Sequence, residues 1–130
     1  MANSDWNLTV IAVDNFQSKN QINEPVPVDT GGTVNLLGTL TRVAGQPSLP
    51  HDVRLKTDFK RTDTGSSETR TGDGPNTHTV DSDPFEIQHP HGIDEDMPDP
   101  SEWDIRVWLK DGDDPWVIKD DFPLQIPDPS

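Results

Sequence analysis

The residues of this chain that could bind a metal ion lie in short polar segments of its second half. The most concentrated set is the aspartate-rich turn around Gly112, which contains Asp111, Asp113 and Asp114. Because Ca²⁺ prefers about six to eight oxygen ligands, clustered carboxylates in a tight turn could bind it. The spacing differs from an EF-hand loop, and Asp-Gly is itself a favoured hairpin turn. A Ca²⁺ site and a simple turn are therefore both open interpretations.

Two further segments have weaker patterns. His89 and His91 flank a proline and could approach one metal ion, but no third ligand is evident beside them. We therefore interpret both histidines as exposed loop residues. The acidic run Asp94–Asp96 resembles the turn at Gly112, and diffuse binding of monovalent cations would explain both acidic clusters. We expect no cofactor beyond such cations.

Catalysis would require a carboxylate pair or a Ser-His-Asp set held in a pocket. These residue types are all present, but none lies in a local motif such as a nucleophile elbow. The chain has no cysteine, which removes thiol nucleophiles, thiolate metal sites and disulfides. We expect a protein that is not an enzyme.

The charge of the chain indicates its environment. It has 24 acidic residues, nineteen of them aspartate, against 10 basic residues, for a net charge of −14. Residues 1–60 are nearly neutral, whereas residues 61–130 hold most of the surplus acids. Such a surface stays hydrated in molar salt, where screening removes its self-repulsion. We predict a halophilic host, with an ordinary acidic mesophilic protein as the alternative.

The same composition bears on partners and location. Nucleic acid is not expected as a direct partner, because binding phosphates requires clustered Lys and Arg. No apolar run approaches the ~20 residues of a membrane span, so we expect no membrane association. Met1 is followed by Ala-Asn-Ser-Asp rather than by a basic and then apolar leader, which predicts no export signal.

Alternation of apolar and polar residues with period two predicts β-strands, and no long window favours a helix. The predicted strands are residues 6–13, 34–41 and 53–60, a short strand with Val80, Phe85 and Ile87, and a terminal hairpin over 103–126. Asp120 and Asp121 predict a β-bulge in the return strand of that hairpin. Residues 61–79 are predicted to form a long polar loop with at most one edge strand, and residues 90–102 an acidic, proline-rich connection.

About seven short strands without a helix predict an all-β fold, an antiparallel β-sandwich that occupies residues 1–130 as a single domain. Trp108 lies on the polar side of its strand, opposite Trp103, Ile105 and Val107. An outward tryptophan is often an interface anchor. A strand buried on both faces would give the same pattern, so both interpretations stay open.

The strand pattern resembles immunoglobulin-like sandwich domains. The resemblance is clearest in Trp6–Val13, in the Gly-Gly turn that leads into Thr33–Thr41, and in the hairpin Trp103–Ile126. It covers most of the chain as a pattern of strands. The cysteine pair and the tyrosine corner of antibody domains are both missing.

Acidic, cysteine-free domains of this kind are similar to modules of haloarchaeal surface proteins and to components of tailed-virus particles. The resemblance implies a structural protein of a virion from a halophilic host, such as a capsid decoration, a turret or a tail-associated domain. Its partners would be the major capsid or tail protein and further copies of itself. The alternative is a binding or adhesion module of a haloarchaeal cell-surface protein, and a further rival is an acidic mimic of nucleic acid. We expect residues 1–60 to supply the contact surface and residues 61–130 to face the brine.

Overall fold

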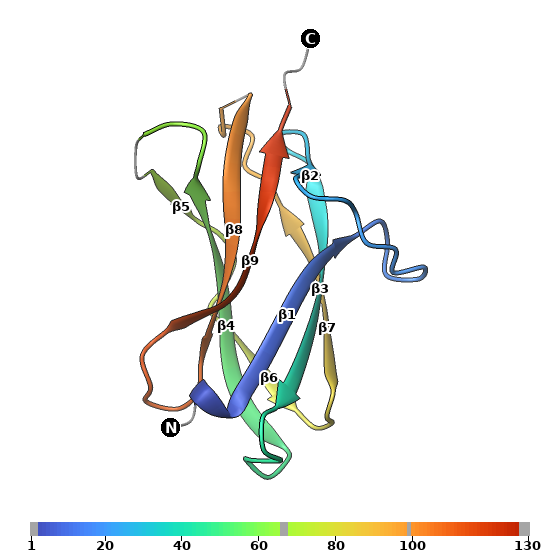
Figure 1. Ribbon diagram of the computed structural model, residues 1–130, viewed down its shortest axis with the longest axis vertical. Helices are drawn as coiled ribbons and strands as arrows, with labels where there is room; N and C mark the ends of the chain where they lie inside the picture. The colour runs from blue at the N-terminus through green and yellow to red at the C-terminus, as the bar shows by residue number, and fades with distance from the viewer. Residues whose placement is uncertain (1–2, 66–67, 99, 128–130) are drawn as a thin grey trace.

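Two β-sheets pack face to face in the computed structural model, which describes residues 3–65, 68–98 and 100–127 (Figure 1). The strands are β1 (Trp6–Val13), β2 (Val26–Pro27), β3 (Thr33–Arg42), β4 (His51–Arg61), β5 (Thr69–Thr71), β6 (Asn76–Val80), β7 (Phe85–Gly92), β8 (Ser101–Lys110) and β9 (Val117–Ile126). The smaller sheet has the order β1-β3-β7, and the larger has the order β2-β9-β8-β4-β5, with β6 also paired to β4. Among the strand pairs of the described residues, only the short pair of β2 and β9 is parallel. The predicted all-β sandwich is confirmed.

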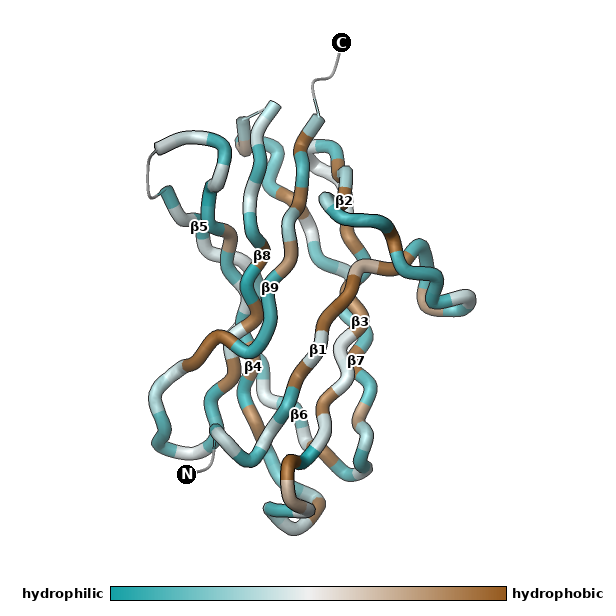
Figure 2. Tube along the Cα trace, viewed as in Figure 1, coloured by the Kyte–Doolittle hydropathy of each residue, from teal (hydrophilic) through white to brown (hydrophobic). Residues whose placement is uncertain are grey.

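The core lies between the sheets and follows from the alternation along each strand. In β8, every second side chain from Ser101 to Leu109 is buried, and the residues between them face outward. β1 and β4 repeat this pattern with buried side chains such as Leu8 and Phe59. Figure 2 shows the same alternation of apolar and polar residues along the central strands. Burial of one side of each sheet is the main stabilising contribution.

The three strands predicted in residues 6–60 are confirmed to within two residues at each end. The terminal hairpin is also confirmed, and its strands carry an irregularity where Val107 pairs with Asp120 and Trp108 pairs with Ile118. Lys119 is thus the extra residue, one position before the predicted bulge.

The prediction of a loop over residues 61–79 with at most one strand is wrong. β5 and all but the last residue of β6 lie within it and pair with β4, and residues 66–67 fall outside the described part of the chain. These two edge strands show no alternation of apolar and polar residues because most of their side chains remain in contact with solvent. These two strands therefore form by hydrogen bonding to β4 and not by burial of an apolar face.

The chain also differs from prediction between Val80 and Ser101. Val80 ends β6 in the larger sheet, whereas Phe85 begins β7 in the smaller sheet, so they do not share a strand. β7 continues past Pro90, because an edge strand tolerates proline. The acidic connection therefore shortens to residues 93–100, of which residue 99 lies outside the described part.

No helix in the described ranges is long and apolar enough to cross a membrane. Met1, on which the expectation of no export signal rests, lies outside the described residues.

Candidate functional site

The outward side of the larger sheet carries half of the basic residues of the chain. We call this surface the outer face and define it by the outward side chains of β4 and β8, with Ile118 and Asp121 beside them on β9 and Trp116 just before that strand. Its charged residues are Arg54, Lys56, Lys60, Arg106 and Lys110, together with Asp52, Asp58, Glu102, Asp104 and Asp121. Five bases balance five acids, so the outer face is neutral. The remaining five bases and nineteen acids give the rest of the chain a net charge of −14.

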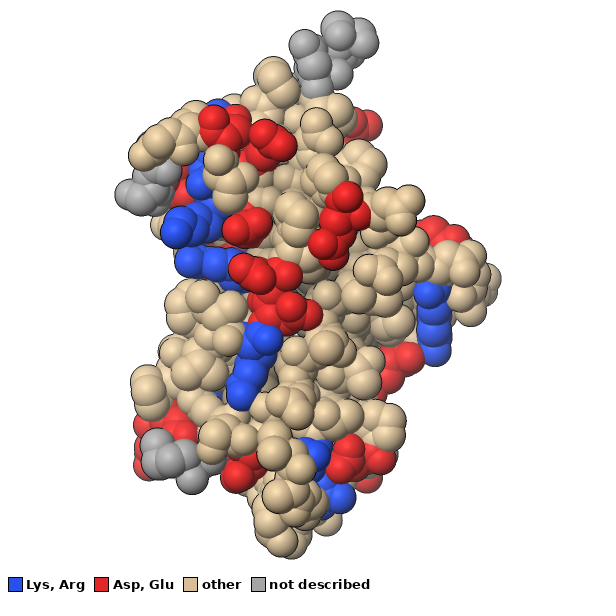
Figure 3. All heavy atoms as spheres, in the orientation of Figure 1, with Lys and Arg blue, Asp and Glu red and all other residues tan. Residues whose placement is uncertain are grey.

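The neutral outer face draws its charged residues from both halves of the sequence. β4, from the first half, pairs with β8, from the second half, and both contribute to the outer face. The expectation that residues 1–60 supply the contact surface stays a prediction, and the outer face draws on both halves of the sequence. Figure 3 shows acidic side chains scattered over the visible surface; some Lys and Arg side chains lie at its left margin, beside the larger sheet, and others lie near its centre, right and lower edge.

Aromatic rings and cations alternate across the outer face. The Lys56 ammonium lies 4.5 Å from the ring centroid of Trp116 and 5.2 Å from that of Trp108. The guanidinium of Arg54 is 5.6 Å from Trp116, and that of Arg106 is 5.3 Å from Trp108. The register explains the stack, because Lys56 pairs directly with Trp108. Each such contact contributes about 0.5–1 kcal/mol where it is partly exposed.

Asp58 holds Arg106 and Trp108, which lie at the centre of these alternating rings and cations. Both Nε and Nη2 of Arg106 donate to its carboxylate, and Trp108 Nε1 donates to Oδ1 at 3.0 Å. The hydrogen bonds that Arg106 donates to Asp58 are the main reason why the pKa of Arg106 is raised. Trp108 is half-buried and points outward, as its alternation predicts, and its ring is held by the charged side chains beside it. Its role as an interface anchor stays a prediction.

The aspartates predicted to bind Ca²⁺ have other partners. Asp111 is 3% exposed, and its carboxylate accepts a hydrogen bond from Trp6 Nε1 at 2.8 Å and lies 2.7 Å from His51 Nε2. Asp114 Oδ2 accepts the backbone N–H of Asn3 at 2.9 Å. These two carboxylates hold the start of β1 and its preceding turn, whereas Asp113 is exposed.

Among the described residues, no three His, Cys, Asp or Glu side chains are grouped so that they could hold a metal ion. In the second acidic run, Asp96 pairs with Arg70 at 3.0 Å. Cation binding at either cluster stays a prediction.

The interpretation of His89 and His91 as exposed loop residues is wrong. Both lie on the inward side of β7, in the same alternation as Phe85 and Ile87. His91 is 1% exposed; its Nδ1–H donates to the carbonyl of Gly92, so its Nε2 accepts the hydroxyl hydrogen bond of Thr57 at 2.7 Å. Burial lowers the pKa of His91.

The sandwich closes differently at its two edges. At one edge, Lys119 Nζ donates to the carbonyl of Trp6 at 2.7 Å and Asp120 accepts the N–H of Val10 at 2.6 Å, which ties β9 to β1. At the other edge, His89 Nε2 and Asp73 Oδ2 lie 2.7 Å apart and bridge β7 to the segment before β6. The sheets separate beside this bridge.

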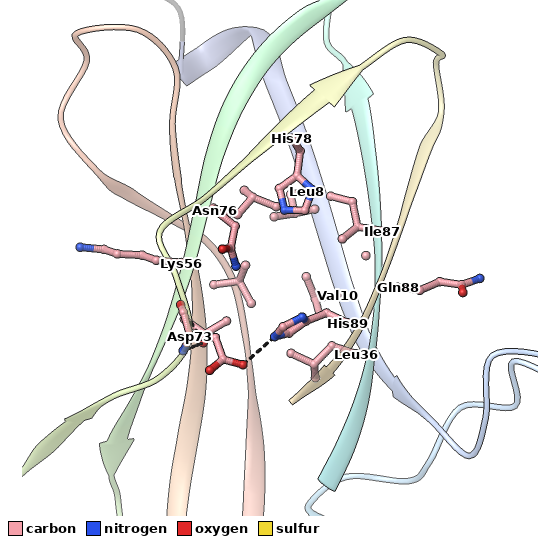
Figure 4. Close-up of a pocket in the computed structure, with 14 residues that line it drawn as sticks. Leu8, Val10, Leu36, Lys56, Asp73, Asn76, His78, Ile87, Gln88 and His89 are labelled. Carbon is pink, nitrogen blue, oxygen red and sulfur yellow. Dashed lines mark hydrogen bonds and ion pairs between the residues drawn. The ribbon is translucent and has the colours of Figure 1, made fainter. Parts of the chain in front are cut away.

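The separation leaves a cleft of about 80 Å³ between β6 and β7, which we call the inter-sheet cleft (Figure 4). Its rim carries Asp73, Asn76, His78 and His89, and burial lowers the pKa of His78 with a smaller contribution from His89. Its floor is aliphatic and consists of Leu8, Val10, Leu36, Leu55, Ile87 and Val107. Since about 10–15 Å³ suffices for one water molecule, the cleft has room for a small organic group.

Sequence reasoning missed the inter-sheet cleft entirely. Three of its rim residues come from residues 61–79, which showed no periodicity, and the fourth was assigned to a loop. One pattern in the sequence pointed to the cleft: the alternation of Phe85 and Ile87 continues through His89, which places His89 on the inward side of the same strand.

No protein-family model matches this chain, and no curated protein matches it in sequence. The outer face and the inter-sheet cleft therefore carry the argument about function.

Proposed function

We propose that this protein is a non-enzymatic structural protein of a virus particle from a halophilic host. In this proposal an immunoglobulin-like sandwich decorates or reinforces the particle and contacts its neighbours through the outer face. The observation that carries the proposal is the neutrality of that face, in a chain whose remaining surface holds the whole net charge of −14.

The strand order supports the immunoglobulin-like part of the proposal. In such sandwiches, strands A, B and E lie in one sheet and strands C, F and G in the other. Here β1, β3 and β7 take the places of A, B and E, and β4, β8 and β9 take those of C, F and G.

The physical conditions of brine favour contact through the outer face. At ~1 M salt the Debye length is about 3 Å, so attraction between distant charges is screened and only groups in direct contact contribute. The outer face offers such groups in Trp108 and Trp116, and in Ile118, which is 44% exposed. Because Asp58 and Lys56 already hold the two rings, little side-chain entropy would be lost on binding.

The partners in this proposal are the major capsid or tail protein and further copies of the chain. In direct contact, an acidic partner surface would meet a surplus of carboxylates on the rest of this protein but balanced charges on the outer face, where no net charge opposes its approach. Two copies can meet through their outer faces for the same reason.

The contact surface is tested with two matched substitutions. Ile118→Ser removes an exposed apolar side chain from the outer face, and Val43→Ser removes one that is 55% exposed and lies outside it. Val43 lies outside the strands, so Val43→Ser should change stability by less than about 0.5 kcal/mol, whereas Ile118→Ser in β9 should cost about 1 kcal/mol and leave the chain folded. We expect Ile118→Ser to weaken assembly at least threefold in sedimentation velocity at high salt, and Val43→Ser to leave it unchanged. Equal effects of the two substitutions would contradict the assignment of the outer face.

The location is tested separately by fractionation of a producing culture with an antibody to this chain. The proposal predicts that the chain sediments with particles. Recovery from cell envelopes alone would contradict a virion location and would favour an adhesion module.

A further inference from the structure

The inter-sheet cleft has a floor that a glycine keeps open. Gly38 lies in the middle of β3 and lines the cleft. A Cβ at this position would lie 3.6 Å from Ile87 Cβ and 3.6 Å from Leu8 Cδ1, at ordinary contact distance. Gly38 does not have a positive φ, so its backbone conformation does not require glycine. Glycine inside a strand weakens it and often marks close approach of a ligand.

The rim of the cleft carries hydrogen-bonding groups without protein partners. Within the part of the chain that the structure describes, the His78 ring and the Asn76 amide make no hydrogen bond. Figure 4 shows both side chains directed toward the interior of the cleft from β6. An amide supplies two donors and an acceptor, and a neutral imidazole supplies one of each. A polar group that enters the cleft would therefore find both kinds of partner.

The charges around the cleft disfavour an ionised ligand. Asp73 carries a carboxylate at the rim, and Lys56 points away from the cleft toward the tryptophans of the outer face. An anion would meet Asp73 as well as the negative potential of the whole chain. A cation would be attracted by the same potential, but within the cleft it would find only Asp73 as a counter-charge, whose Oδ2 already bonds His89, and it would lose water against an aliphatic floor.

We propose that the inter-sheet cleft binds a small neutral molecule with a short aliphatic part and one amide or hydroxyl group. The aliphatic part lies against Leu8, Leu36 and Ile87 on the floor. The polar group exchanges hydrogen bonds with His78 and Asn76 at the rim. This binding site is independent of the proposed assembly role.

The probe for this site is isobutyramide, with isobutyrate and isobutylamine as charged molecules of the same shape. Each is titrated into isotopically labelled protein while amide and histidine ring shifts are followed by NMR. We expect saturable shifts with isobutyramide, confined to the lining residues, with a Kd on the order of 1 mM. The two charged probes should bind at least about tenfold more weakly, which corresponds to the cost of about one lost polar interaction. Non-saturable shifts, or equal binding of all three probes, would overturn the proposal.

Two glycine substitutions separate occupancy of the cleft from a general effect. Gly38→Val places methyl groups in the cleft, whereas Gly92→Val, in β7, has no atom within 4 Å of the added Cβ. We expect Gly38→Val to weaken isobutyramide binding at least tenfold and Gly92→Val to change it less than twofold. If Gly38→Val does not fold, Asn76→Leu at the exposed rim replaces it, and we expect a loss of at least threefold. Wild-type affinity in the folded Gly38→Val protein, or in Asn76→Leu, would refute the site.

Discussion

Replacement of Asp111 by alanine tests whether the aspartate-rich turn is a structural element or a cation site. Trp6 is 1% exposed, and its indole N–H donates to Asp111. The substitution leaves this buried donor without a partner, which costs about 1–3 kcal/mol. Loss of the contact with His51 adds little to this free-energy cost, because a third of the His51 side chain is exposed and can bond to water. We expect Asp111→Ala to lower the free energy of unfolding by about 2–3 kcal/mol, and Asp111→Asn, which keeps one acceptor, by about half as much.

The assay is urea unfolding followed by tryptophan fluorescence at constant salt, with either Ca²⁺ or EDTA present. Asp113→Ala is the matched control, because Asp113 is an exposed residue of the same turn, and it should change stability by less than about 0.5 kcal/mol. The reasoning is refuted if Asp113→Ala costs as much as Asp111→Ala. It is also refuted if EDTA destabilises the wild-type protein and removes the difference between the wild type and the Asp111 variants.

Three further predictions concern the buried histidines and the outer face. Thr57→Val removes the hydroxyl that bonds His91 Nε2 at 2.7 Å and should cost about 1–3 kcal/mol in urea unfolding; a neutral result would contradict that hydrogen bond. Burial lowers the pKa of His91 and His78, so as the pH falls the unfolded state takes up protons before the folded state does. The stability that the two neutral rings contribute is therefore complete above about pH 6.5 and is lost as the pH falls toward their pKa in the folded state. Unfolding curves at pH 7.5 and 5.5, chosen as about one unit either side of that value, should show lower stability at the acidic pH, and unchanged stability would be inconsistent with buried neutral rings. Trp108→Ser removes the hydrogen bond to Asp58 and the stacked cations, and calorimetry should show a loss of about 1–2 kcal/mol together with weaker assembly; a loss above about 4 kcal/mol would indicate a core residue and eliminate the interface.

The strands that could be predicted from the sequence are those whose two sides differ in solvation. β1, β4 and β8 each bury every second residue, so alternation alone locates them and also indicates that Trp108 points outward. β5 and β6 were not predicted because they form by backbone pairing with β4. Such pairing does not require apolar and polar residues to alternate along an edge strand. β7 was cut short because Pro90 was interpreted as its end, although an edge strand has room for a proline.

The candidate surfaces depend on long-range pairing, which the sequence does not display. The outer face exists only because β4 and β8 are neighbours, and residues 54 and 110 pair although they are far apart in the chain. The inter-sheet cleft exists because β6 and β7, consecutive in sequence, belong to different sheets. Asp111 was recognised as a notable residue, but its hydrogen bond to Trp6 joins opposite ends of the chain and could not be inferred from local spacing.

Sedimentation velocity in ~3 M and ~0.15 M KCl, with tryptophan fluorescence recorded at each salt concentration, tests the proposed assembly role most directly. We predict a folded oligomer at high salt that dissociates or unfolds at low salt, because the surplus of acids repels when screening is weak. A stable folded monomer at both concentrations would contradict the account.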